Sequence, residues 1–219
     1  MTTRTRIKRA MVNAAFFILI LLALVAAFFL LPWSKTKAEF ERTVKTRTEA
    51  ASTYLGYFSE EDIEGLPSPV GRYFRYCGYL GTLKMKYMKA TFKDVDFVLS
   101  DDKTVKIDYT QYNFVNEPAR IAYISSSMYA VPFEGFDSFT SGSGRMKGVI
   151  AKVVTLFDQD GRNMDRASLV TVLAECLLVP NVALQDYIVW EAIDETLYLI
   201  HISEPTRLLS ISYAVFCLQ

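Results

Sequence analysis

The sequence predicts an α+β protein: an N-terminal transmembrane helix, then a curved antiparallel β-sheet, half-barrel-like, with a helix packed across it. Three observations support this fold class. Residues 11–31 form an unbroken apolar run. From residue 82 onward, apolar and polar side chains alternate with a period of two, and no βαβ pattern separates the strands. A single amphipathic helix pattern then follows at residues 165–180.

The apolar run contains Asn13 as its only polar side chain and carries no charge. At about 1.5 Å per residue it reaches roughly 30 Å, the thickness of the hydrocarbon core of a bilayer. We therefore assign residues 11–32 as a transmembrane signal anchor and the lipid bilayer as its partner. Representative anchoring side chains are Met11, Phe16, Leu21, Phe28 and Leu31.

Basic side chains set the expected orientation. The stub of residues 1–10 holds Arg4, Arg6, Lys8 and Arg9 and no acidic residue, so the positive-inside rule keeps it in the cytoplasm. We expect a single-pass protein of a bacterial cytoplasmic membrane, with everything after Trp33 extracytoplasmic. A cleavable signal peptide is the alternative, since residues 25–27 offer small side chains, but signal apolar regions usually span about 7–15 residues.

Residues 33–65 are predicted to form a juxtamembrane helix and linker. The stretch 35–53 is charged and contains few apolar positions, which is typical of a solvated spacer. The extracytoplasmic domain is assigned to residues 66–198. It opens with a short amphipathic helix, in which Val70, Tyr73 and Phe74 share one face.

The strands of the domain are predicted from alternation and from turn residues. Turns are expected at 101–103 and at 158–161, where Asp, Gly and Lys cluster. The expected strands cover residues 83–89, 95–99, 105–109, 109–114, 119–126, 144–157 and 187–193. Asp165 is expected to cap the one long helix, and Pro180 to end it.

Composition limits the function classes. Residues 32–198 carry 23 acidic and 19 basic side chains, a net charge of about −4, which argues against binding to nucleic acid. Cys77 and Cys176 either form one disulfide or remain thiols; the apolar helix face around Cys176 favours buried thiols.

The last residues look foreign to the domain. LIHISEPTR, from Leu199, resembles a translated sequencing-library adapter, and ISYAVFCL resembles the adapter sequence beyond the sample index. We therefore expect residues 199–219 to be a non-native tail and the natural domain to be truncated here. His201, the single histidine, lies in this tail, so Ser-His-Asp and Cys-His catalysis and His-based metal sites lose their key residue. No metal and no cofactor is expected.

Several segments together resemble a known family. Their order along residues 66–194 is distinctive, although each segment alone is weakly specific. The segments are LPSPVGRYFRYCG (66–78), Gln111 to Arg120 with Pro118, GFDSFTSGSGRM (135–146), LVTVLAECLLVP (169–180) and VWEAID (189–194). They resemble an uncharacterised bacterial domain-of-unknown-function family. The resemblance implies a β-rich domain similar to a lipoprotein-carrier half-barrel, and it implies no activity.

Two groups of side chains are candidates for a site. Asp137 and Glu175 are the candidate catalytic pair, because two carboxylates can perform acid–base chemistry when one of them is held neutral. Arg120 is expected to pair with either carboxylate. The candidate ligand-binding residues are Arg120, Tyr123, Phe133 and Phe136, which belong to an aromatic-rich region that forms either a ligand cavity or plain core.

The sequence therefore supports two functions. The first is a membrane-anchored module that binds a hydrophobic ligand or a protein partner. The second is a two-carboxylate hydrolase that uses Asp137 and Glu175, which requires their carboxyl groups to lie within about 10 Å in a cleft. The absence of a catalytic histidine outside the tail favours the binding module over an enzyme.

Overall fold

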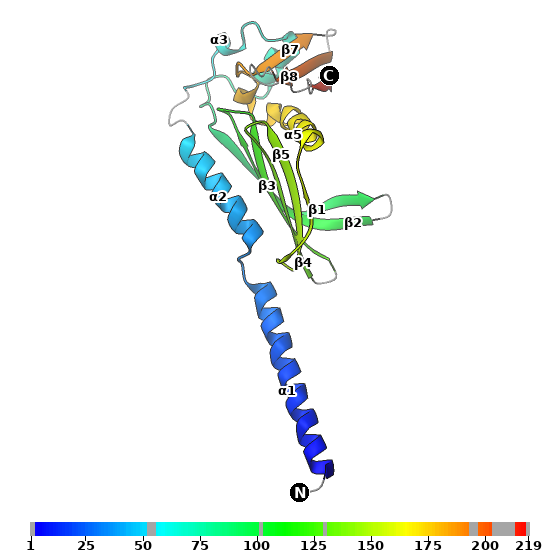
Figure 1. The fold of residues 1–219 in the computed structure, drawn as a ribbon. Helices are drawn as coiled ribbons and strands as arrows, with labels where there is room; N and C mark the ends of the chain where they lie inside the picture. The colour runs from blue at the N-terminus through cyan, green and yellow to red at the C-terminus, as the bar shows by residue number, and fades with distance from the viewer. Residues whose placement is uncertain are drawn as a thin grey trace.

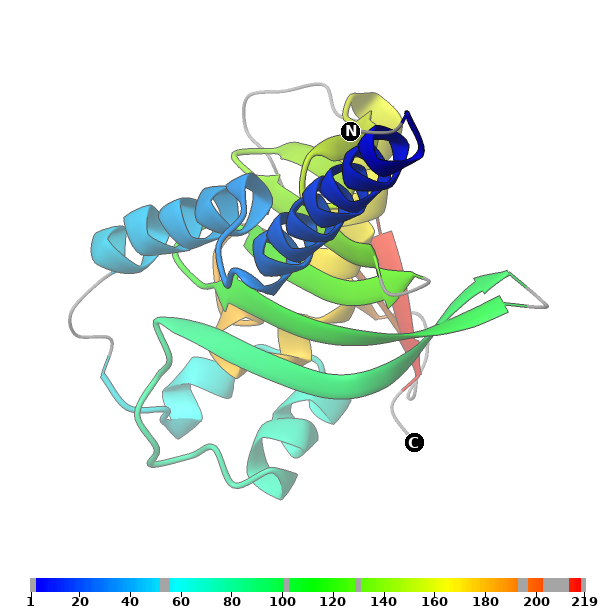
Figure 2. The same cartoon turned by 90° about the horizontal axis from the view of Figure 1, so that it is seen from below.

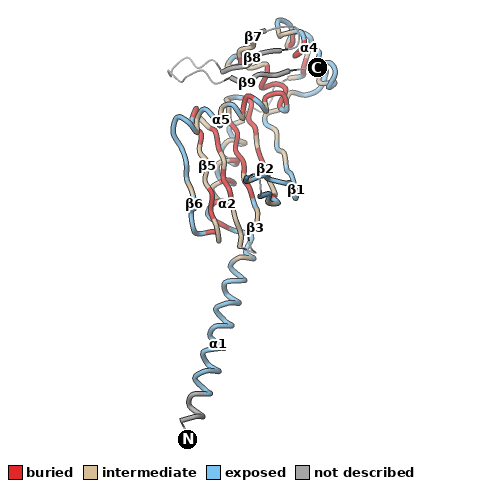
Figure 3. The backbone as a smooth tube through the Cα atoms, turned by 90° about the vertical axis from the view of Figure 1, so that its right-hand side faces the viewer, coloured by how far each residue is buried: buried red, intermediate tan, exposed pale blue. Residues whose placement is uncertain are grey.

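The computed structural model describes residues 3–51, 56–100, 103–128, 131–192, 197–202 and 213–217. It begins with a long helix, α1 (Thr3–Leu30), which stands away from the rest of the chain (Figure 1). Among the described residues, this is the helix long and apolar enough to cross a membrane, and its most apolar stretch is not covered by the domain. Figure 3 shows α1 exposed over almost all of its length, whereas buried residues run through the sheet.

A break separates α1 from the second helix, α2 (Lys35–Ala50). Pro32 lies in the break and has no N–H with which to continue a helical ladder. Ser34 then starts α2, because its hydroxyl accepts a hydrogen bond from the backbone N–H of Lys37 at 3.0 Å. The helix or stalk expected at 35–53 corresponds to α2, which ends at Ala50; residues 52 and 53 lie outside the described residues.

Six strands follow and form one antiparallel sheet in chain order. They are β1 (Tyr87–Ser100), β2 (Lys103–Phe114), β3 (Ala119–Met128), β4 (Val131–Thr140), β5 (Ser143–Ile150) and β6 (Val154–Gln159). The sheet is curved and stays open, with β1 and β6 at its edges (Figure 2). Within β1, the register with β2 shifts between Phe92 and Val95, where Asp94 takes a positive φ of 52°.

α2 packs on one face of the sheet and is not a solvated spacer. The ring of Phe40 lies 5.5 Å from that of Tyr123 and 6.1 Å from that of Tyr112, measured between centroids. Glu39 of α2 accepts hydrogen bonds from Arg145 at 2.9 Å and from Lys147, both on β5. The core beneath α2 consists of Phe40, Val44, Phe114, Ala119, Ile121 and Phe136.

The helix α5 (Arg162–Ala174) packs on the other face of the same sheet (Figure 1). Side chains alternate between faces along a strand, so Tyr112 under α2 and Asn113 under α5 point in opposite directions. Gly144 allows the close approach of α5, because a Cβ there would lie 2.6 Å from the carbonyl oxygen of Met164 and 2.6 Å from Ser168 Oγ.

A second core lies at the end of the sheet far from α1. Short elements surround it: α3 (Glu60–Ile63), α4 (Ser68–Tyr76), η1 (Cys176–Leu178) and η2 (Pro180–Val182). Its most buried side chains include Phe58, Val70, Phe74, Leu173, Cys176 and Val179. A three-stranded sheet of β7 (Ile188–Ala192), β8 (Leu197–Ile202) and β9 (Tyr213–Cys217) adjoins this end. The foreign origin of residues 199–219, which contain β9 and most of β8, stays a prediction.

The predicted fold class is confirmed: an apolar N-terminal helix, an open antiparallel sheet and a helix packed against it. The start of the long helix differs, because α5 begins at Arg162 and Asp165 lies in its first turn instead of capping it.

Three details of the strands differ as well. The strand β4 has no counterpart among the expected strands. Its Pro132 and Gly135, and the spacing of Phe133, Phe136 and Phe139 three residues apart, hide the alternation. The expected strand 144–157 is two strands joined by a turn at Ala151 and Lys152, which both take positive φ. Residues 158–161 lead into α5 rather than closing a hairpin.

The two cysteines outside the tail are free thiols, with Cys77 exposed and Cys176 buried. Burial raises the pKa of the Cys176 thiol to about 12, so this side chain behaves as a small apolar group of the second core.

Two glycines should respond to alanine with opposite signs. Gly144→Ala forces a Cβ into the backbone of α5 and should destabilise the domain by about 1–3 kcal/mol. Gly71→Ala, within α4, meets its nearest atom at 3.4 Å and should stabilise by about 0.5–1 kcal/mol, because alanine favours a helix. Urea unfolding of the full-length protein in detergent micelles, followed by tryptophan fluorescence, measures both. If Gly144→Ala left the free energy of unfolding unchanged, α5 would not pack as closely on β5 as the structure shows.

Candidate functional site

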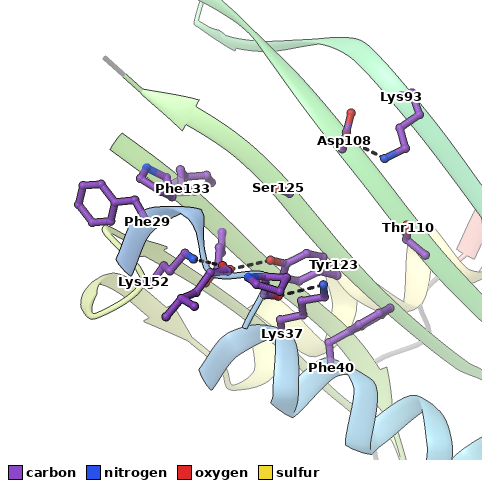
Figure 4. A pocket seen from close by; sticks show the side chains of 14 residues that line it. Phe29, Lys37, Phe40, Lys93, Asp108, Thr110, Tyr123, Ser125, Phe133 and Lys152 are labelled. Atoms are coloured by element: carbon purple, nitrogen blue, oxygen red, sulfur yellow. Dashed lines mark hydrogen bonds and ion pairs between the residues drawn. The ribbon is translucent and has the colours of Figure 1, made fainter. Parts of the chain in front are cut away.

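A cavity of about 410 Å³ lies where α1 ends, on the face of the sheet that carries α2. Four parts of the chain form it (Figure 4). The end of α1 and the break contribute Phe29, Leu31 and Pro32, and α2 contributes Lys37 and Phe40. Strands β1 to β4 contribute Lys93, Asp108, Thr110, Tyr123, Ser125, Pro132, Phe133 and Glu134, and the β5–β6 turn contributes Lys152.

Glu134 is the exceptional side chain of this cavity. The residue is only 5% exposed, and its Oε1 accepts a hydrogen bond from the Tyr123 hydroxyl at 2.7 Å. Its Oε2 has no hydrogen-bond partner among the described residues. A buried carboxylate oxygen without a donor costs free energy, so such an atom in a cavity marks a place for a donor from outside the chain.

Tyr123 serves Glu134 as a neutral donor. Burial, and then the hydrogen bond to Glu134, raise the pKa of the Tyr123 hydroxyl far above its ordinary value of 10. The hydroxyl therefore keeps its proton throughout the physiological pH range. One of the two oxygens of Glu134 is thus permanently occupied, and the other remains available.

The lysines of the cavity bond to other groups. Lys152 Nζ donates to the carbonyl oxygen of Phe28, in the last turn of α1, at 3.2 Å, and to that of Leu31, directly after α1. Lys37 Nζ donates to the carbonyl oxygen of Pro32 at 3.1 Å. Such bonds satisfy carbonyls that a helix end leaves unpaired, and the positive charge complements the helix dipole. Lys152 thereby fixes the end of α1 to the sheet.

A second polar cluster lies on the opposite face, beneath α5. Arg120 Nη1 lies 2.5 Å from Asp137 Oδ2, and Arg120 Nε lies 3.0 Å from Glu175 Oε2. Gln111 and Asn113 also donate to Glu175 Oε2, at 3.1 Å and 2.7 Å. The sequence led us to expect that Arg120 pairs with either Asp137 or Glu175. In the structure Arg120 contacts both.

The environment of the Arg120 cluster favours a neutral Tyr109 and a charged Arg120. Burial raises the pKa of Tyr109, which contacts the Arg120 guanidinium, to about 12. Burial alone would lower the pKa of Arg120, but Tyr109, Glu175 and Asp137 outweigh it and raise this pKa. A charged guanidinium that holds two carboxylates is typical of a structural ion network.

The predicted ligand residues divide between these places. Tyr123 and Phe133 line the cavity, and Phe136 is buried on the same face in the core beneath α2. Arg120 faces the other side of the sheet, so it cannot contribute to the cavity. The sequence analysis missed Glu134, Lys37 and Lys152. A strand predicted at 131–140 would have placed Glu134 on the same face as Phe136. A single carboxylate among apolar residues on that face would have indicated a candidate site.

No group of three or more metal-ligating side chains occurs in the described part of the chain.

Removal of Arg120 should destabilise the domain strongly. Arg120→Met leaves two partly buried carboxylates without their cation, which should cost about 3–5 kcal/mol. The matched control is Arg75→Met, because the ion pair of Arg75 with Glu60 is exposed and should contribute little to stability. Urea unfolding midpoints compare the two variants. Equal small losses would contradict the structural role of Arg120.

Comparison with known proteins places the chain in a family. No curated protein and no solved structure matches it. The model of a family of unknown function, DUF6544, matches residues 56–211. This range includes β1 to β6, α5 and the residues of β1 to β4 that line the cavity. This match agrees with the resemblance seen in the sequence motifs. The chain therefore belongs to DUF6544, a family of unknown function.

Proposed function

We propose that this protein is a single-pass membrane module whose extracytoplasmic domain binds an amphiphilic ligand from the bilayer in the cavity at the end of α1. The observation that carries the proposal is the composition of that cavity. Phe29, Leu31 and Phe133 provide apolar surface, and Glu134 provides a buried oxygen without a partner. Charged and hydroxyl side chains share the lining about equally with apolar and aromatic ones, which suits a ligand with both a polar and an apolar part.

The position of the cavity supports a ligand that comes from the membrane. If α1 crosses the bilayer, Leu31 lies at the bilayer surface, and the cavity that Leu31 lines begins there. Arg4, Arg6, Lys8 and Arg9 before α1 favour an extracytoplasmic domain, on the outer face of a bacterial cytoplasmic membrane. The cavity volume falls at the lower end of the range of small-molecule sites.

A second candidate function, hydrolysis by Asp137 and Glu175, has one observation in its favour. Both carboxylates contact the guanidinium of Arg120, which keeps their bonded oxygens within roughly 8 Å of each other, a separation that two-carboxylate hydrolysis can use. The same contacts disfavour it, because both carboxylates are already engaged in ion pairs with Arg120. The binding function therefore comes first.

Filling the cavity should abolish ligand binding. Thr110→Trp places a large ring among the lining residues, whereas Thr104→Trp, on the same strand, is exposed and outside the cavity. We expect the full-length protein in lipid nanodiscs to be photolabelled on β4, as well as on α1, by a phospholipid with a diazirine in its acyl chain. Thr110→Trp should reduce labelling of β4 at least about fivefold, equivalent to about 1 kcal/mol. Thr104→Trp should not. Labelling confined to α1 in every variant would contradict the proposal.

A separate experiment tests the hydrolase candidate. Wild type, Asp137→Asn and Glu175→Gln should all hydrolyse p-nitrophenyl glycosides no faster than buffer does. Hydrolysis by wild type that both variants lose would favour the enzyme, because a structural ion network has no reason to turn over substrate.

A further inference from the structure

We propose that the cavity selects lipids with a primary ammonium headgroup, specifically a zwitterionic phosphoethanolamine headgroup whose ammonium donates to Glu134 Oε2. This inference rests on the proposed function and assigns the chemistry of its ligand. The headgroup is inferred from Glu134, which lines the cavity and is only 5% exposed. Its Oε2 has no hydrogen-bond partner among the described residues.

The unpaired oxygen calls for a cationic donor. Glu134 receives one hydrogen bond from a neutral hydroxyl, and a buried carboxylate is stabilised far more by a charged donor. Lys37 and Lys152 line the same cavity, but their ammonium groups donate to main-chain carbonyls. Lys93 is paired with Asp108 at 2.8 Å, toward the far end of the cavity in Figure 4. None of these three lysines bonds to Glu134, so a ligand can supply the cation.

The same cavity also offers donors for a phosphate. An ammonium has three donors; Lys37 Nζ uses one on Pro32 and Lys152 Nζ uses two at the end of α1. Figure 4 shows Lys37 and Lys152 reaching toward the end of the cavity where the Tyr123 hydroxyl lies. A phosphoethanolamine group carries both required features, an anionic phosphate for the free lysine donors and an ammonium for Glu134.

Other headgroups meet only part of this requirement. A phosphocholine headgroup has no N–H and cannot donate to Oε2. A phosphoglycerol headgroup supplies hydroxyl donors but no cation, so the carboxylate of Glu134 stays without a charged partner. The source is a lipid rather than a soluble amine, because Phe29, Leu31 and Phe133 provide apolar surface that a soluble headgroup would leave uncovered.

The experiment compares headgroups on one acyl-chain probe. Full-length protein in phosphatidylcholine nanodiscs receives trace diazirine probes with phosphoethanolamine, phosphocholine or phosphoglycerol headgroups. The readout is the labelling of β4 divided by that of α1, which every lipid around the helix labels. We expect the phosphoethanolamine probe to give at least about a tenfold higher ratio than either other probe, equivalent to about 1.4 kcal/mol.

Two matched variants locate the selectivity. Glu134→Gln keeps the size of the side chain and removes its charge, so the three probes should give equal ratios. Glu49→Gln, at an exposed position of α2, should keep the selectivity. Glu134→Gln should also unfold at the same temperature as wild type or higher, because it removes a buried charge without a full set of partners. The labelling ratios of Glu134→Gln can therefore be compared with those of wild type.

Each outcome decides a different claim. Selectivity that persists in Glu134→Gln, or equal β4 labelling by all three probes in wild type, would overturn the headgroup inference and leave the proposed function intact. Labelling of α1 alone by every probe would overturn both. Soluble phosphoethanolamine that abolishes β4 labelling at micromolar concentration would show that a free amine, and not a lipid, is the ligand, and it would overturn the inference as stated.

Discussion

The structure depends on the attachment of the N-terminal helix α1 to the sheet. Lys152 bonds to a carbonyl in the last turn of α1, and Glu39 of α2 joins Arg145 and Lys147 on β5. Phe40 then seals α2 onto the aromatic face of the sheet. Because these contacts fix both sides of the break at Pro32, the end of α1 becomes one wall of the cavity. A flexible stalk would leave no cavity at that position.

The two faces of the sheet differ in how fully their buried carboxylates are hydrogen-bonded. Beneath α5, Arg120 satisfies Asp137 and Glu175, and Gln111 and Asn113 complete the network. Every strong donor there has an acceptor, which is what a structural cluster requires. Beneath α2, Glu134 keeps an oxygen without a partner. The contrast between a satisfied and an unsatisfied buried carboxylate is the reason to place ligand binding on the α2 face.

The sequence predicts the architecture better than the site. The apolar run, the alternating strands and the α5 stripe are local patterns, and they give the fold class because local periodicity reflects one buried face. The site is assembled from α1, α2, four strands and a turn, and no local pattern brings Lys152 beside Leu31. Glu134 was missed since β4 was missed, and the pairing of Asp137 with Arg120 follows from strand register, which alternation does not determine.

The central claim is that the cavity holds one lipid with a specific headgroup. Native mass spectrometry of the full-length protein, released from vesicles of equal parts phosphatidylethanolamine, phosphatidylcholine and phosphatidylglycerol, measures this directly. The account predicts one retained lipid per chain, with the mass of phosphatidylethanolamine, which is lost when Thr110→Trp fills the cavity. Retention of all three lipids in proportion to the vesicle, unchanged by Thr110→Trp, would contradict it.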